Sequence, residues 1–295
     1  MNVSVGVGVA VLAAVALAAQ SLAVRRSTAS HSVSDVVAGV FLVNLVVLVP
    51  LSVASHRPPY GLTPRSLAAL AIGGLLGSLL ARAALFVGIE RLGASRAEAL
   101  KSTFPLVAVV AAVVALGEGI TPTVAAGVVL LVAGAAAVSW DARASPVTAS
   151  GREVWTHVGF PLAAAVCLGV DPVFTKVGLA GETPALVGAT VRVLAAACGF
   201  GLYLGWRRVR HDASWPSRPG RWTVVVGIAN TTYLSAYLWA LSREPVNVVA
   251  PILGASPLLV LLGSALFARD DEQLTARLGI AVAVLVAGVV LIVSG

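Results

Sequence analysis

Long apolar stretches separated by short polar joints make up nearly the whole chain. An α-helix needs about 20 apolar residues to cross a hydrocarbon core about 30 Å thick, because it rises about 1.5 Å per residue. Ten stretches approach that length, so we predict an all-α membrane protein with ten transmembrane helices. They are residues 3–24, 36–54, 67–89, 94–116, 123–140, 158–177, 184–206, 222–241, 246–268 and 276–293.

The two halves of the chain repeat one pattern of landmarks. Each has a proline in its fourth apolar stretch, then a glutamate, then a glycine sixteen residues after that glutamate: Pro105, Glu118 and Gly134, and Pro257, Glu272 and Gly288. We predict a five-helix repeat over 1–140, a linker over 141–157 and a second five-helix repeat over 158–295. Because five is an odd number, the two repeats must insert in opposite senses, as inverted repeats. Such a duplicated bundle is typical of a transporter.

Composition excludes a soluble protein, since 58% of the residues are apolar and only 11% are charged. Most cations behind the net charge of +7 lie in the joints, where they anchor a membrane protein. We therefore expect a multi-pass protein of the cell membrane with the lipid bilayer as a partner and no nucleic acid. Thirteen Arg or Lys fall in one set of alternate joints and four in the other. If the richer set is cytoplasmic, both termini face outward.

These features resemble the EamA family of the drug/metabolite transporter superfamily. The resemblance rests on the two five-helix repeats, the proline in each fourth helix, and Gly117-Glu118 or Asp271-Glu272 before each fifth helix. It implies transport of a small molecule and contains no substrate signature. Members of the family generally keep both termini in the cytoplasm, opposite to the orientation that the cation count favours.

A first group of polar side chains at membrane depth lies in the hairpin of the third and fourth helices. Arg82 and Lys101 stand at similar distances from its turn, and Glu98 shares a helical face with Lys101. These three side chains are predicted to hold an anionic or zwitterionic substrate group in a cavity between the repeats, because buried charges are costly to keep. The predicted cavity includes Ser78 and Ser102. The alternative is an internal ion pair that locks the hairpin, with Lys101 reaching the membrane interface.

A second pair lies in the hairpin of the sixth and seventh helices. Asp171 and Arg192 are about equally far from its turn, so they should face each other. Pro172 removes a backbone donor next to Asp171, which predicts a kinked or broken helix at this acid. Broken helices near the midplane are typical of substrate or ion sites in transporters. A structural salt bridge is the alternative.

The corresponding hairpin of the second repeat is neutral. Its hydroxyl, phenol and amide groups suit a small polar molecule with an apolar part better than a bare ion. Interhelical hydrogen bonding is the alternative explanation for some of them. The candidates for the cavity are Asn230, Tyr233, Tyr237 and Ser256, with Gln20 of the first helix.

Other landmarks are interpreted as structural. Glu118 and Glu272 each stand in a joint just before a helix, where a carboxylate caps backbone donors. The family resemblance implies the same role. Pro105 and Pro257 are interpreted as kinks that open a cavity. The small-residue pairs Gly73/Gly77 and Gly201/Gly205 are interpreted as helix-packing patterns.

Absent motifs narrow the energy source. Neither lysine follows a glycine, so there is no P-loop, and no dinucleotide-binding turn or Ser-His-Asp arrangement is found. We expect no cofactor, no metal and no catalytic residue, with energy from a proton or ion gradient, protons or ions being the coupling species, or from the substrate's own gradient. The sequence predicts a secondary-active exporter of small polar or amphipathic metabolites that works by alternating access. The alternatives are a membrane-embedded enzyme acting on a lipid-borne substrate and a non-transporting scaffold. Oligomeric state is not predicted.

Overall fold

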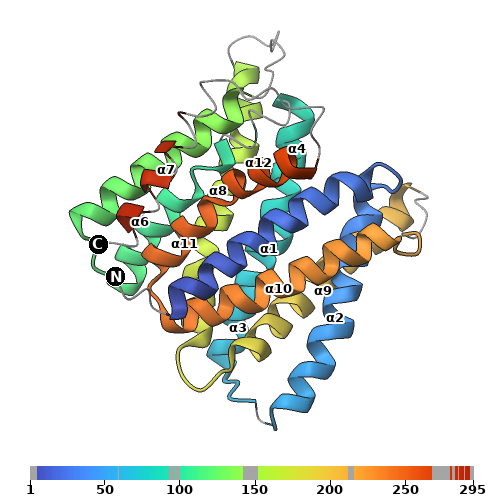
Figure 1. The fold of residues 1–295 in the computed structure, drawn as a ribbon. Helices are drawn as coiled ribbons and strands as arrows, with labels where there is room; N and C mark the ends of the chain where they lie inside the picture. The colour runs from blue at the N-terminus through green and yellow to red at the C-terminus, as the bar shows by residue number, and fades with distance from the viewer. Residues whose placement is uncertain are drawn as a thin grey trace.

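The computed structural model is all-helical over the residues that it describes, which contain no strand (Figure 1). These residues are 5–58, 60–92, 97, 100–141, 152–211, 216–267, 280, 283–284, 286–288 and 290–292. The helices of the first half are α1 (Val5–Thr28), α2 (Val33–Ser55), α3 (Pro64–Gly74), the π-helix η1 (Leu75–Leu80), α4 (Ala81–Leu92), α6 (Phe104–Leu116) and α7 (Pro122–Asp141). Those of the second half are α8 (Arg152–Leu179), α9 (Ala185–His211), α10 (Arg221–Arg243), α11 (Val246–Gly254) and α12 (Ser256–Phe267). The described residues between 280 and 292 are also helical.

Local sequence sets several helix ends. Ser32 and Asp35 form a reciprocal capping box at the start of α2. Thr63 and Ser66 form another at the start of α3, where a proline occupies the first turn. Gly117 follows the end of α6 with a φ of 67°, a left-handed conformation that glycine adopts without a steric penalty.

Six segments in the described part of the chain are long and apolar enough to cross a membrane. Large apolar side chains on their outer faces are strongly exposed; Leu202 of α9, for example, is 77% exposed. In a membrane protein lipid covers such a surface. Exposure of the same surface to water would be unfavourable. The prediction of an all-helical, multi-pass membrane protein is therefore confirmed. The six segments are Val5–Thr28, Val33–Ser55, Pro64–Gly88, Val158–Leu179, Ala185–Arg210 and Arg221–Arg243.

The fourth predicted stretch of each half is not one straight helix. Ser102 and Thr103 form a turn before α6, and Ala255 forms a turn between α11 and α12. Pro105 and Pro257 lie in the first turn of the helix that follows, where a missing N–H is tolerated. At these prolines, where kinks were predicted, a short turn therefore interrupts the helix.

Of the kink or break predicted next to Asp171, the break does not occur. α8 continues through Pro172 as one helix, packed along its length by α3, α4 and α6. A proline inside a helix removes one backbone hydrogen bond, and neighbouring helices commonly stabilise that loss in membrane proteins. The irregular turn facing α8 lies instead in η1, which joins α3 to α4.

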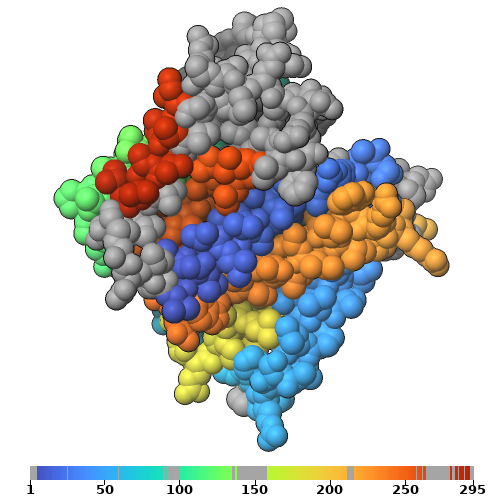
Figure 2. Space-filling view, in the orientation of Figure 1, coloured from blue at the N-terminus to red at the C-terminus, as the bar shows by residue number. Residues whose placement is uncertain are grey.

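Helices of the two halves pack in matching pairs. α1 lies along α10 and meets α11 and α12, and α8 lies along α3 and α4 and meets α6. In both cases the first helix of one half packs on the third and fourth segments of the other. α1 and α10 lie side by side across the face seen in Figure 2. The contact between the halves is thus the core of the molecule.

Contacts at the helix ends define one end of the molecule, here called the Glu118 end. Gly6 at the start of α1 lies against the side chain of Glu244, the residue that follows α10. Lys176, near the end of α8, donates a hydrogen bond to the backbone carbonyl of Glu244. Glu118, just after α6, contacts the start of α11. The start of α1 and the end of α8 therefore lie at the same end.

The opposite end is here called the Trp222 end. The guanidinium of Arg26, late in α1, lies 5.0 Å from the ring centroid of Trp222, early in α10. The guanidinium of Arg91, at the end of α4, lies 4.6 Å from the ring centroid of Phe160, early in α8. Each of these cation–π contacts joins a helix of one half to a helix of the other, so the halves also pack against each other at this end.

Candidate substrate site

The acid and the base predicted to face each other form a buried ion pair. Arg192 of α9 donates from both terminal nitrogens to the carboxylate of Asp171 on α8, with Nη2 2.9 Å from Oδ2. Thr175 donates to Oδ1 of the same carboxylate at 2.9 Å and also contacts Arg192. Asp171 is 4% exposed and Arg192 is 1% exposed. Each charge therefore depends on the other, because neither reaches bulk water.

Two glycines of the first half make room for this pair. A Cβ atom added at Gly73 would lie 2.7 Å from Nη1 of Arg192, and one added at Gly77 would overlap the Asp171 carboxylate. Gly77 belongs to η1, and π-helical turns recur at functional sites. The predicted Gly73/Gly77 packing pattern is therefore confirmed, and it packs against charged side chains of the other half.

Tyrosines of α10 form a wall beside the pair. The Arg192 guanidinium lies 5.8 Å from the ring centroid of Tyr237, and Tyr237 stacks on Tyr233 with centroids 5.7 Å apart. Arg82 of α4, which is partly buried, lies within electrostatic range of Tyr233. We call the whole group the Asp171 cluster; its members are Asp171, Thr175, Arg192, Tyr233, Tyr237 and Arg82.

The Asp171 cluster combines charge, hydrogen-bond donors and aromatic faces in one buried place. It carries two guanidinium groups and one carboxylate, so its described side chains have an excess of positive charge. Among the described residues, Nε of Arg192 has no hydrogen-bond partner despite its burial. A buried donor without an acceptor is costly, so an oxygen of a bound molecule would gain from it. This arrangement suits a small molecule with a carboxylate or similar group and an apolar part.

The predicted group of Arg82, Glu98 and Lys101 is only partly described. Lys101 is partly buried at the turn before α6, next to the buried Ser102. Glu98 lies outside the described residues, so its pairing with Lys101 stays a prediction. Ser78 is partly buried in η1. Arg82 itself lies within electrostatic range of Tyr233 of α10.

Gln20 and Asn230, predicted as cavity residues, are joined in a buried network that links three helices. Asn230 of α10 donates to Gln20 of α1 at 3.0 Å. The side chain of Asn44 on α2 lies within hydrogen-bond distance of Asn230, at 2.7 Å, and of Thr231, at 2.9 Å. This is the interhelical hydrogen bonding that the sequence left open as the alternative. Ser256 is partly buried at the start of α12.

Glu118 caps a helix, but not the one that follows it in sequence. Its carboxylate accepts from the backbone N–H groups of Val246 at 2.9 Å and Asn247 at 3.0 Å, at the start of α11 in the other half. The Asn247 side chain donates to the carbonyl of Gly119 at 2.6 Å, and Lys176 Nζ lies 3.8 Å from Glu118 Oε1. The predicted capping role is therefore correct and the predicted partner helix is wrong. Glu272 lies outside the described residues.

Sequence reasoning missed three residues of these networks. Thr175 was detectable, since it stands one helical turn after Asp171. Asn44 was also detectable, because it interrupts the apolar stretch of the second helix. The position of Lys176 beside Glu118 depends on how the halves pack, and local sequence contains no signal for it. In the described part of the chain, no cluster of three His, Cys, Asp or Glu could hold a metal.

Membrane-length apolar helices packed around a buried charged cluster define an integral membrane protein built around a polar site. The chain belongs to the EamA-like transporter family, whose model matches residues 4–140 and 156–294. The resemblance noted in the sequence is thus confirmed, and the protein is a membrane transporter of the drug/metabolite type. A solved structure described only as "Crystal structure of protein" superposes with a TM-score of 0.76 at 21% sequence identity, over 98% of this chain and 96% of its own. No curated protein matches the chain.

Proposed function

We propose that this protein is a secondary-active exporter of small polar or amphipathic metabolites, with the Asp171 cluster as its substrate and coupling site. The observation that carries this proposal is a fully buried ion pair at the contact between the two halves. Asp171 and Arg192 belong to the second half, whereas Gly73 and Gly77, which they touch, belong to the first. A site built from both halves changes its exposure when the halves move.

We further propose ten membrane crossings arranged as two inverted repeats, residues 1–140 and 158–295, with 141–157 as the linker. α1 begins and α8 ends beside Glu244. α6 ends where α11 begins, at the Glu118 carboxylate. Both observations support corresponding helices that run in opposite directions. Inverted halves can exchange conformations and so open a central site to each side in turn.

A zwitterionic substrate fits both the cluster and export driven by protons. Its anionic group would pair with Arg192, its cationic group with Asp171, and its apolar part would lie on the Tyr233 and Tyr237 rings. Substrate and proton then compete for the Asp171 carboxylate. The empty site returns with a proton on Asp171 in a state where the Arg192 contact is broken, and this exclusion couples export to proton entry.

The Glu118 contact is the proposed gate at one end. It ties the joint after α6 in the first half to α11 in the second, and Lys176 connects α8 to the same place. An inward or outward opening at this end must separate those elements. The hydrogen bonds of one carboxylate are few enough to break and reform in each cycle.

A transport screen tests the proposal. Purified protein in liposomes is offered labelled amino acids and other small metabolites in both directions under an imposed pH gradient. The matched variant replaces both members of the pair, Asp171→Leu with Arg192→Met, so that no buried charge is left alone. We expect the unaltered protein to move at least one metabolite and the double variant to move none. Transport of no metabolite, or equal transport by both proteins, would contradict the proposal.

A further inference from the structure

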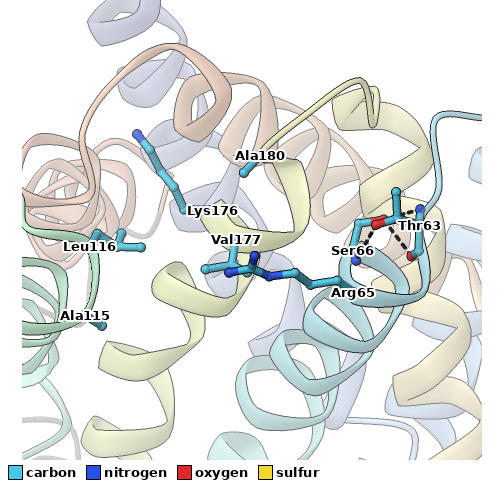
Figure 3. A pocket seen from close by; sticks show the side chains of 8 residues that line it. All are labelled: Thr63, Arg65, Ser66, Ala115, Leu116, Lys176, Val177 and Ala180. Atoms are coloured by element: carbon cyan, nitrogen blue, oxygen red, sulfur yellow. Dashed lines mark hydrogen bonds between the residues drawn. The ribbon is translucent and has the colours of Figure 1, made fainter.

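A cavity of about 340 Å³ opens at the Glu118 end between α3, α6 and α8 (Figure 3). Its volume lies at the lower bound of pockets that bind small molecules. Leu116 of α6 and Val177 of α8 form its apolar wall, and Arg65 of α3 and Lys176 of α8 bring charge to it. The Asp171 cluster is separate from it, but Lys176 directly follows Thr175 of that cluster along α8.

The charged residues that line this cavity are both cations. Figure 3 shows Arg65 extending from α3 toward Val177, with Lys176 pointing to the opposite side. Arg65 is exposed, and the Lys176 side chain is 30% exposed. The hydroxyls of Thr63 and Ser66 are already engaged in the cap of α3. Arg65 attracts anions to this cavity, whereas the charge of Lys176 is shared with the nearby carboxylates of Glu118 and Glu244.

We propose that this cavity is a binding vestibule for carboxylate- or phosphate-bearing small molecules on their way to or from the Asp171 cluster. The proposal rests on the proposed transport function and narrows the substrate to molecules with an anionic group. Lys176 supports it through its place on α8, because the turn of α8 that carries this lining residue also carries Thr175 of the cluster.

The same lysine couples the vestibule to the gate. Lys176 Nζ lies 3.8 Å from Glu118 Oε1, a long and partly exposed ion pair that contributes little stability. An anion in the vestibule competes with Glu118 for this ammonium group. Its arrival therefore weakens the contact between the Glu118 joint, α8 and α11, at the end where the molecule must open.

Cysteine protection tests the vestibule directly. Ala180, an exposed residue of the cavity lining, is changed to Cys after Cys167 and Cys198 are replaced by Ala. Labelling by N-ethylmaleimide is timed in phosphatidylcholine nanodiscs with and without millimolar pyrophosphate or citrate, the affinity range expected of a small exposed site. We expect several-fold slower labelling with either anion. The Arg65→Gln, Lys176→Gln pair should abolish this protection, and Arg57→Gln at the same end should keep it.

Three outcomes overturn the vestibule. An unchanged labelling rate with both anions would show that no anion binds in the cavity. Protection that persists in the Arg65→Gln, Lys176→Gln protein would show that these two residues do not form the site. Protection that requires phosphatidylglycerol in the nanodisc assigns the cavity to a lipid headgroup instead of a substrate. Equal thermal unfolding midpoints of all variants in detergent show that they are folded. The assay needs no gradient and no transport, so a failed transport screen with intact protection refutes the transport function alone.

Discussion

A buried guanidinium with one carboxylate partner governs the chemistry of this molecule at the scale of single residues. Arg192→Met should lower the stability of the protein strongly, by about 3–5 kcal/mol, because it leaves the Asp171 charge buried without a partner. Adding Asp171→Leu should restore most of that stability, since the neutral pair needs no compensation. Thermal unfolding of the purified variants in detergent measures both. A single variant as stable as the unaltered protein would show that water reaches Asp171.

Two glycine pairs of the same spacing should respond differently to alanine. A Cβ at Gly77 overlaps the Asp171 carboxylate, whereas a Cβ at Gly201 meets no atom within 4 Å. Gly77→Ala should therefore disrupt the ion pair and abolish transport. Gly201→Ala should keep transport and stabilise its helix by up to about 1 kcal/mol, through helix propensity. Liposome transport and thermal unfolding of the two variants give the comparison, and equal activity would place Asp171 elsewhere in the working protein.

The ion pair was predictable from sequence because both of its members lie in one hairpin. Asp171 and Arg192 are equally far from their turn, and two charges in apolar helices need a partner. The stacked tyrosines beside Arg192 were candidates, but the electrostatic interaction of Tyr233 with Arg82 depends on packing between the halves. In this bundle the helices of one half pack on helices of the other half, so the site is formed by residues far apart in sequence. Local sequence patterns do not encode such contacts.

At the scale of helices, a polar network fastens α1, α2 and α10 together. Asn44 is fully buried and reaches both Asn230 and Thr231. Asn44→Ala should lower stability by about 1 kcal/mol, the usual contribution of an interhelical hydrogen bond in a membrane protein. Thr232→Ala is the control, because Thr232 is exposed and bonds only within its own helix among the described residues. The unfolding midpoints of the two proteins test this prediction. Equal midpoints would show that the network contributes no stability.

Apolar length located the helices well, but it missed their irregularities. α10 spans Arg221–Arg243, within two residues of the predicted 222–241 at each end. The turn at Ala255 escaped because the apolar pattern continues through it, and Gly254 there packs on Pro105 of the other half. Pro172, by contrast, does not break its helix, because packing keeps α8 helical. Propensity marks places where a helix can break, and tertiary contact decides which of them do.

At the scale of the whole molecule, Glu118 joins the two halves. Glu118→Ala would leave the first backbone donors of α11 without their acceptor, so we expect a loss of about 1–2 kcal/mol, as for other helix caps. Glu118→Gln should recover part of it, because an amide oxygen still accepts. Glu182→Ala removes an exposed carboxylate at the same end and should have little effect. Unfolding midpoints test this ranking. An equal loss of stability in the Glu118→Ala and Glu182→Ala proteins would contradict the proposed gate.

Proton coupling at Asp171 is the central claim, and Asp171→Asn in liposomes tests it most directly. The amide keeps the shape of the side chain and can still accept from Arg192, but it cannot exchange a proton. With a substrate identified by the metabolite screen, we expect this variant to exchange substrate passively, more weakly than the unaltered protein because the substrate's cationic group loses its charged partner, while an imposed pH gradient drives no net transport. Full gradient-driven transport by Asp171→Asn would contradict the account and would leave Asp171 as a structural partner of Arg192.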